Sequence, residues 1–389
     1  MMRAHRGLRL ALCLLGSVGT VTAPAQKASP PHWQKLTDQA LTLKSQGHDK
    51  KALPIALEAA QEAEPSAADD PYFAVTLECL GQIYEHLGES TKAEQLETRA
   101  LAIAEKVLGP QDPTLTPYLN GLATVFNAEG KLTDAEQFME RIVRIDEKAL
   151  KPNDPDLAAD LNNLASVDYE QGKYDKAQPL FERALRIDVK ADPESAQVGL
   201  DLSSLGLLFD HQAKFTQAEP LLKHALAIDE KLKGADNPDV AMDLVNLGVL
   251  YVDQGHYDQA KQLYERALVA MQKTFGPDHP NVAMVVSKLG LVEDHLGRYS
   301  AAEPLLQRAL AIDQKALGPD HSTVATDLYN LAMIEEHQNH YADAEPLYQR
   351  ALAIDEKALG PDHPDVANIL ENLAEIAFYE SKYDQAEQL

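Results

Sequence analysis

Four asparagines hold the same place relative to a Leu-Ala or Leu-Gly pair, which each of them immediately precedes: Asn163, Asn246, Asn330 and Asn372. A side-chain amide carries both a hydrogen-bond donor and an acceptor, so it can bond a peptide backbone whatever the peptide's sequence. A nearby turn of the same predicted helix face carries acidic residues: Glu170, Asp210, Asp253, Asp294 and Glu336. These residue types favour the binding of an extended, neutral or basic polypeptide segment.

The sequence lacks the spacings typical of catalytic centres. It contains no G-x-S-x-G elbow, phosphate-binding glycine loop, dinucleotide fingerprint or H-E-x-x-H motif. His337 and His340 are three residues apart, but a turn at Asn339 falls between them and no third metal ligand recurs nearby. We therefore predict no catalytic residue, no metal site, no cofactor and no enzyme activity.

Other histidines recur in a Gly-Pro-Asp-His segment, at His279, His321 and His363. A catalytic histidine would be needed once, so this repetition indicates a role in the loop itself. A second set follows an acidic residue at the end of predicted helices, at His86, His211, His295 and His337. These histidines are either solvated helix ends or groups that respond to pH near neutrality.

The elements that position these residues come from one unit repeated along the chain. An alanine, in most units before an acidic or amide residue, recurs at steps of 41 or 42 residues: Ala52, Ala93, Ala135, Ala177, Ala218, Ala260, Ala302, Ala344 and Ala386. Each unit has apolar residues at spacings of three and four, typical of two amphipathic helices. In the eighth unit we expect helices from about Ser322 to His337 and from Tyr341 to the stop at Gly360-Pro361.

The unit resembles a tetratricopeptide repeat of the longer, kinesin light chain-like variety. The residues that carry the resemblance include Leu161-Asn162-Asn163-Leu164-Ala165, Gln171-Gly172-Lys173-Tyr174, Arg350-Ala351-Leu352-Ala353-Ile354 and Leu359-Gly360-Pro361-Asp362-His363-Pro364. The resemblance implies an all-α fold, a right-handed α-solenoid of about nine helix-turn-helix units. It also implies that the first helices line a concave groove, that the four asparagines point into it, and that the groove holds a segment of a partner.

The chain departs from the family pattern in two ways. Asp168, Glu293 and Glu335 stand where a tyrosine or another large residue normally packs. A lone buried carboxylate is costly, so we expect looser packing or local salt bridges there. The ninth unit stops early at Leu389, so we also expect the apolar residues Leu373, Ile376 and Phe378 of its first helix to lie uncovered.

The first residues differ in composition from the rest. Arg3, Arg6 and Arg9 precede an apolar run and an Ala23-Pro24-Ala25 pattern, which together predict a signal peptide over 1–25. An uncleaved membrane anchor is the alternative, although the run is short for a membrane span. A short linker, 26–32, and a repeat array, 33–389, would follow. Cleavage would remove three arginines and change the formal charge from −26 to −29, which disfavours nucleic acid and anionic membranes as partners.

These features predict an extracytoplasmic, periplasmic or secreted, protein-interaction scaffold that binds an extended polypeptide in the groove. One alternative is the regulatory or targeting repeat region of a larger, truncated effector protein. Another is a cytoplasmic scaffold whose apolar start arose by chance. The sequence does not identify the partner, the pathway or the oligomeric state.

Overall fold

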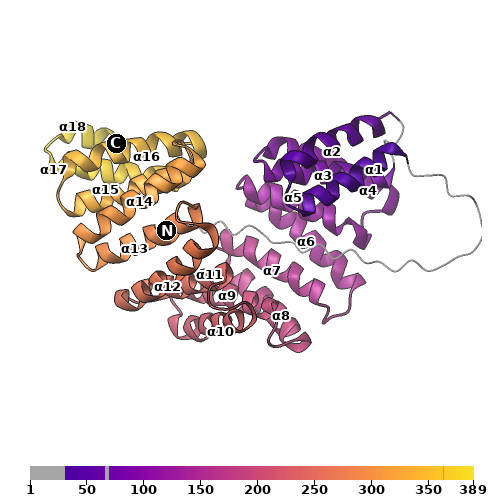
Figure 1. The fold of residues 1–389 in the computed structure, drawn as a ribbon, viewed down its shortest axis with the longest axis horizontal. Coiled ribbons are helices and arrows are strands. Elements are labelled where there is room, and N and C mark those ends of the chain that lie inside the picture. The colour runs from indigo at the N-terminus through magenta and orange to yellow at the C-terminus, as the bar shows by residue number, and fades with distance from the viewer. Residues whose placement is uncertain (1–30, 66–69, 362) are drawn as a thin grey trace, which may run out of the picture. The chain divides into compact units, whose positions relative to one another are not determined.

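The computed structural model describes residues 31–65, 70–361 and 363–389. Over these ranges the chain is built from α-helices and one short 3₁₀ helix, and it contains no strand (Figure 1). The predicted all-α fold is confirmed. The predicted signal peptide and most of the predicted linker lie outside the described residues.

The helices follow one another in pairs. The first helices are α1 (His32–Ser45), α3 (Pro71–His86), α5 (Thr116–Ala128), α7 (Pro155–Glu170), α9 (Ala196–His211), α11 (Pro238–Asp253), α13 (Pro280–His295), α15 (Ser322–His337) and α17 (Pro364–Tyr379). The second helices are α2 (Asp49–Ala63), α4 (Ser90–Leu108), α6 (Leu132–Ala149), α8 (Tyr174–Ala191), α10 (Phe215–Lys233), α12 (Tyr257–Phe275), α14 (Tyr299–Leu317), α16 (Tyr341–Leu359) and α18 (Tyr383–Gln388). The 3₁₀ helix Pro113–Leu115 precedes α5. The helices of the eighth pair match their predicted ranges.

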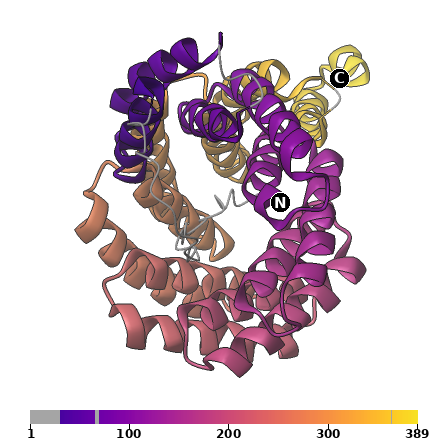
Figure 2. The same ribbon diagram turned by 90° about the vertical axis from the view of Figure 1, so that its right-hand side faces the viewer.

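The chain forms two compact units, which divide after Pro193. The N-terminal unit contains α1 to α8, and the C-terminal unit contains α9 to α18. Inside each unit, a second helix packs against the first helix of its own pair and against the first helix of the next pair. Figure 2 shows this side-by-side stacking within each unit from a second direction.

Small residues allow the helices of a pair to approach closely. The recurring alanines from Ala52 to Ala344 are fully buried, as is Ala332 on the facing helix of the eighth pair. A larger side chain at these positions would hold the two backbones apart. Leu373 and Ile376 in α17 are also buried, so the expected uncovering of this helix is found at Phe378, which is 59% exposed, and is wrong for them.

From the second repeat onward, a side-chain cap marks where each first helix, or the 3₁₀ helix before α5, begins. The capping side chain accepts a hydrogen bond from a backbone N–H two or three residues further on; the caps are Asp70, Asp112, Asp154, Ser195, Asn237, His279, His321 and His363. In the three histidine caps the acceptor is Nδ1, at 3.1 to 3.2 Å. The Gly-Pro-Asp-His histidines therefore act as helix caps, in agreement with the predicted loop role.

A residue with positive φ ends the first helix of every described pair. Glycine holds this position in most pairs, but Ala213 (φ 55°), Asn339 (φ 62°) and Ser381 (φ 63°) hold it in three. The following N–H then bonds a carbonyl five residues back, as Lys214 does to Phe209 at 2.8 Å. This hydrogen bond satisfies a carbonyl at the helix end, whereas the Cβ of Ala213 makes its own conformation unfavourable.

A basic residue that follows this turn interacts with the side chain five residues earlier. This contact accounts for the acidic residues that stand near the ends of some first helices. Where phenylalanine holds the position, the lysine lies over its ring: Lys131 Nζ is 5.3 Å from the Phe126 centroid, and Lys214 Nζ is 5.6 Å from the Phe209 centroid. Where Glu293 replaces the aromatic residue, Arg298 pairs with it at 3.4 Å and Lys261 at 2.5 Å. The predicted local salt bridge is therefore confirmed for Glu293, and Glu335 lies within hydrogen-bond distance of His340 Nδ1, at 3.0 Å.

The third acid, Asp168, is stabilised indirectly. It is buried and shares a hydrogen bond with Glu136, which accepts from Lys176 at 2.9 Å and from Lys173. Burial and the Glu136 charge raise the pKa of Asp168 to about 6.

Two interfaces between repeats bury a pair of aspartates. Asp146 in α6 shares a hydrogen bond with Asp160 in α7, and Asp313 in α14 shares one with Asp327 in α15. Burial raises the pKa of Asp160 to about 9 and that of Asp327 to about 8, so each pair keeps a proton at neutral pH.

Replacing Ala213 by glycine should stabilise the C-terminal unit by about 1 kcal/mol, because glycine adopts a positive φ without a steric cost. The matched control is Ala227→Gly, at an exposed site inside α10 of the same repeat, which should destabilise it by about 1 kcal/mol. Urea unfolding followed by circular dichroism measures both changes. A loss of stability in the first variant would contradict the assigned turn.

The Asp313–Asp327 pair should make the fold less stable as the pH rises. Its folded pKa lies above the unfolded value of about 3.9, so the stabilising proton is fully retained near pH 4 and is lost toward pH 8. The double variant Asp313→Met with Asp327→Val copies the buried Met271 and Val285 at the α12–α13 interface. Between pH 5 and pH 8, the free energy of unfolding of the double variant should rise by at least about 1 kcal/mol relative to that of the natural protein. Parallel pH profiles for both proteins would contradict the proton-sharing assignment.

Candidate functional site

The first helices form the inner layer of each unit. They contact one another directly, as α1 does with α3, α3 with α5, α9 with α11 and α13 with α15, in addition to their contacts with second helices. In a curved stack of helices the more closely spaced layer lies on the inside. Side chains between successive first helices therefore form the candidate binding face.

The four asparagines occupy equivalent places in this layer, on α7, α11, α15 and α17. Two of them bond the preceding first helix: Asn330 Nδ2 donates to Ser287 Oγ at 3.4 Å, and Asn372 Nδ2 donates to Tyr329 Oη at 3.0 Å. Asn163 is half-buried, whereas Asn246 is buried and its Nδ2 has no hydrogen-bond partner. The amides of Asn330 and Asn372 therefore connect neighbouring first helices, whereas the Nδ2 donor of Asn246 remains unused.

The five acidic residues do not lie in a single row. Glu170 and Asp253 are seven residues from the asparagine position of their helices, whereas Asp210, Asp294 and Glu336 are six residues from it. Successive residues of an α-helix are rotated by about 100° about its axis, so the side chains of the two sets point to different sides of their helices. Glu170 and Asp253 are exposed, and the other three are buried or half-buried.

Two acids of the inward set have partners within the chain. Asp294 is 2.9 Å from Nδ1 of His337 on the next first helix. Glu336 accepts from the Tyr348 hydroxyl at 2.8 Å, and Tyr348 reaches it from a second helix. These contacts tie consecutive helices together, so Asp294 and Glu336 contribute less free charge than the sequence predicts.

Two of the remaining acids, Asp210 and Asp253, interact electrostatically with each other and with Tyr264, and Asp253 also acts on Lys288. Together with Asn246, which shares α11 with Asp253, we call these residues the central cluster: Asp210, Asn246, Asp253, Tyr264 and Lys288. Asp210 is buried and its Oδ1 has no hydrogen-bond partner. Burial, together with the Asp253 charge, raises the pKa of Asp210 to about 7. Burial lowers the pKa of Lys288 to about 8, against the attraction of Asp253. The central cluster therefore holds an unsatisfied donor, an unsatisfied acceptor and groups that titrate near neutrality.

Tyr264 was not expected at this site. It projects from α12, and its ring packs on Gly248 in α11, where any side chain would collide with it. Burial and the charges of Asp253 and Asp210 raise the pKa of its hydroxyl. Leucine or phenylalanine holds the equivalent position in nearby repeats, at Phe181, Leu222 and Leu306. The replacement of an apolar side chain by a hydroxyl-bearing one at Tyr264 is the signal that sequence reasoning could have used.

One group of potential metal ligands lies elsewhere. Glu335, His340 and Asp343 present ligand atoms within 4.8 Å of one another. In the preceding repeat, Arg298 takes the place of His340 and pairs with Glu293, the counterpart of Glu335. A nitrogen-bearing side chain therefore bonds the glutamate at this position in both repeats, which favours a structural contact over a metal site.

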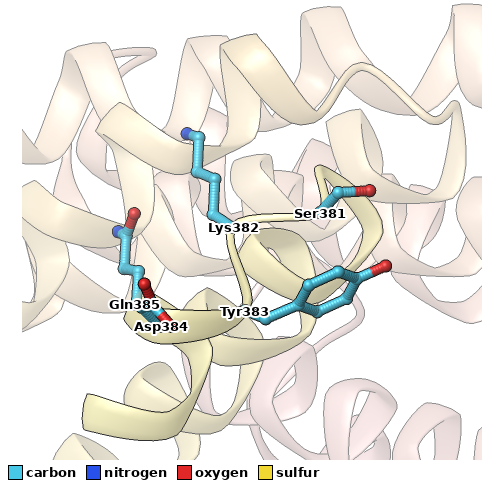
Figure 3. A pocket seen from close by; sticks show the side chains of 5 residues that line it. All are labelled: Ser381, Lys382, Tyr383, Asp384 and Gln385. Carbon is cyan, nitrogen blue, oxygen red and sulfur yellow. The ribbon is translucent and has the colours of Figure 1, made fainter.

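A shallow depression at the start of α18 is lined by Ser381, Lys382, Tyr383, Asp384 and Gln385, which are consecutive in the chain (Figure 3). Lys382 pairs with Glu380 at 2.6 Å and with Glu345 at 3.2 Å. The depression brings together no groups from different repeats. The candidate site is therefore the central cluster.

Tetratricopeptide repeat models match the chain over residues 72–148, 114–188, 201–268, 257–315, 283–357 and 325–389, and a second such model matches residues 162–232. The chain belongs to the tetratricopeptide repeat family. The search of curated proteins found no match. In the part of the chain that the structure describes, no helix is both long enough and apolar enough to cross a membrane.

Solved structures of tetratricopeptide repeat proteins resemble the chain. BtubC (BKLC) from P. vanneervenii is 26% identical over 60% of this chain and 92% of that chain, with a TM-score of 0.47. A putative kinesin light chain repeat protein from Podosopora anserina is 21% identical over 64% and 97%, with a TM-score of 0.35. A Rap protein complexed with competence and sporulation factor is 15% identical over 92% and 99%, with a TM-score of 0.56. The neighbours thus include a protein described as a putative kinesin light chain.

Lys288 should titrate far below the other lysines, at a pKa of about 8. Asp253→Asn should lower the pKa of Lys288 further, because the Asp253 charge favours the ammonium form. The control is Asp320→Asn, which removes an exposed carboxylate beside Lys357 and should leave Lys288 unchanged. Nuclear magnetic resonance of ¹³C-methylated lysines reports both values. An ordinary pKa for Lys288 would contradict its burial.

Proposed function

We propose that this protein is a non-enzymatic interaction scaffold that binds an extended polypeptide segment along the first-helix face of its C-terminal unit. Membership of the tetratricopeptide repeat family supports a protein-binding role. The Rap neighbour is described in complex with competence and sporulation factor, which is consistent with ligand binding by this fold.

The unsatisfied groups of the central cluster carry the proposal. A peptide bond presents one N–H donor and one carbonyl acceptor. The Asn246 amide would donate to the carbonyl, and the Asp210 carboxylate would accept from the N–H. A buried polar group without a partner costs about 1–3 kcal/mol, so a bound backbone would remove a cost that the free protein carries.

Two other asparagines extend this face. Asn330 and Asn372 would bond the segment through their carbonyl oxygens or remaining N–H groups, and Asn163, on α7 of the N-terminal unit, would offer the same groups to a segment bound there. Exposed Glu170 and Asp253, with the net charge of −26, would favour a basic or neutral segment and disfavour nucleic acid. Asp294 and Glu336 would act mainly by fixing the helices on either side.

We also propose that binding takes place outside the cytoplasm, after removal of residues 1–25. The basic start, the apolar run and the Ala-Pro-Ala pattern support this proposal. N-terminal sequencing of protein from fractionated cells tests it, and an intact Met1 in cytoplasmic protein would contradict it.

Asn246→Ala should weaken the binding of a partner captured with the natural protein by roughly ten-fold, since one hydrogen bond at a desolvated site is lost. Asp253→Asn alone should change affinity little at physiological salt, because an exposed charge contributes about 0–1 kcal/mol and is screened. Isothermal titration calorimetry measures both.

The control variant is Val269→Ser, which changes a residue of α12 that is 62% exposed. It should bind like the natural protein. Normal binding by Asn246→Ala together with a loss in Val269→Ser would move the site to the second-helix face.

A further inference from the structure

The N-terminal unit contains a buried glutamate at a position that is otherwise apolar or aromatic. Glu97 in α4 corresponds, at steps of 41 or 42 residues, to Met139, Phe181, Leu222, Tyr264, Leu306 and Tyr348. All six are buried, and Glu97 is also only 1% exposed. A carboxylate here replaces favourable apolar contacts with a costly buried charge, so the packing of the repeat does not explain it.

Two glycines make room for this carboxylate. A Cβ added to Gly81 in α3 would lie 2.7 Å from Glu97 Oε1, and one added to Gly121 in α5 would lie 2.6 Å from Oε2. Gly121 holds the place in α5 that Asn163 holds in α7. The carboxylate therefore reaches from a second helix into the first-helix layer, at the level of the asparagines.

The charges around Glu97 are not balanced. Its Oε2 has no hydrogen-bond partner. Glu78 in α3 lies nearby, accepts from Gln82 Nε2 at 3.1 Å, and has its pKa raised to about 7 by burial. Lys44 in α1 donates to Gln82 and is the cation that acts on both glutamates. We call Lys44, Glu78, Gln82 and Glu97 the Glu97 site.

The other titratable groups that face this site do not supply the missing charge. Asp49 and Glu85 lie 3.2 and 3.6 Å from His86. Burial raises the pKa values of the Cys79 thiol, to about 12, and of the Tyr118 hydroxyl, so both stay neutral. Burial and the Glu78 charge raise the pKa of Glu97 well above its usual range. The free protein thus holds a proton on a carboxylate that has Lys44 as its nearby cation and shares this cation with Glu78.

The geometry favours an organic cation over a metal ion. A calcium ion takes six to eight oxygen ligands, and the metal-ligand group found among the described residues lies elsewhere, at Glu335, His340 and Asp343. An ammonium or guanidinium group brings its own N–H donors to carboxylates that lack them. Gly81 and Gly121 themselves place no side chain beside the carboxylate.

We propose that the Glu97 site binds the cationic end of a lysine or arginine side chain presented by a polypeptide partner at the N-terminal unit. On binding, Glu97 releases its proton to the solvent, and its carboxylate pairs with the incoming cation. This inference rests on the proposed function, since the cation belongs to the polypeptide partner. It concerns α1, α3, α4 and α5 alone.

The test uses full-length protein labelled with ¹⁵N-glycine, so that Gly81 and Gly121 report on the Glu97 carboxylate. Titration with acetyl-Gly-Lys-Gly-amide should shift both signals, and the arginine tripeptide should do the same. The norleucine tripeptide, which has an uncharged side chain, should not shift them. Glu97→Gln should weaken lysine tripeptide binding at least ten-fold. Equal shifts with norleucine, or unchanged binding by Glu97→Gln, would overturn the proposal.

A second variant separates ligand binding from a structural role. Glu97→Met installs the residue that the next repeat uses at Met139, so it should abolish tripeptide binding and raise the thermal unfolding midpoint. A lower midpoint would show that the carboxylate stabilises the fold and would overturn the proposal. Because the tripeptide titration needs no captured partner, it can succeed even where the Asn246→Ala experiment fails.

Discussion

The close approach of helices within each unit determines whether its polar side chains are hydrogen-bonded, protonated or left without a partner. Each repeat buries its apolar surface only against neighbouring repeats, and small residues such as Ala332 and Ala344 bring the backbones together. Polar side chains on the contacting faces consequently lose contact with water. Each such side chain either bonds a partner within the chain, keeps a proton, or stays unsatisfied until a ligand binds.

All three outcomes occur in this chain. Glu293 is neutralised by cations, and Asp327 shares a proton with its neighbour. Asp210 and Asn246 keep unsatisfied atoms, as does Glu97 in the N-terminal unit. Equivalent positions of different repeats can be compared directly, because Asp294 and Asn330 have partners where Asp210 and Asn246 have open atoms. In the C-terminal unit the open positions lie in the first-helix layer, where a bound segment would reach them.

Local sequence patterns were sufficient to predict the fold, whereas contacts between repeats were not. The bounds of α15 and α16 follow from apolar spacing and from Gly360-Pro361, which act within a few residues. The acidic residues were predicted as one set, but a difference of one residue turns Asp210 and Asp253 in different directions. The Asp294–His337 contact spans 43 positions, and the setting of Glu97 depends on glycines from two other helices. No single periodicity encodes such contacts.

Hydrogen–deuterium exchange of the protein with its captured partner tests the central claim most directly, namely that the open positions of the first-helix layer receive the segment. The account predicts slower exchange on binding in Ala196–His211, Pro238–Asp253 and Pro280–His295, which are α9, α11 and α13. Exchange in Phe215–Lys233 and Tyr257–Phe275, the intervening second helices, should change little. Protection confined to those second helices would contradict the account.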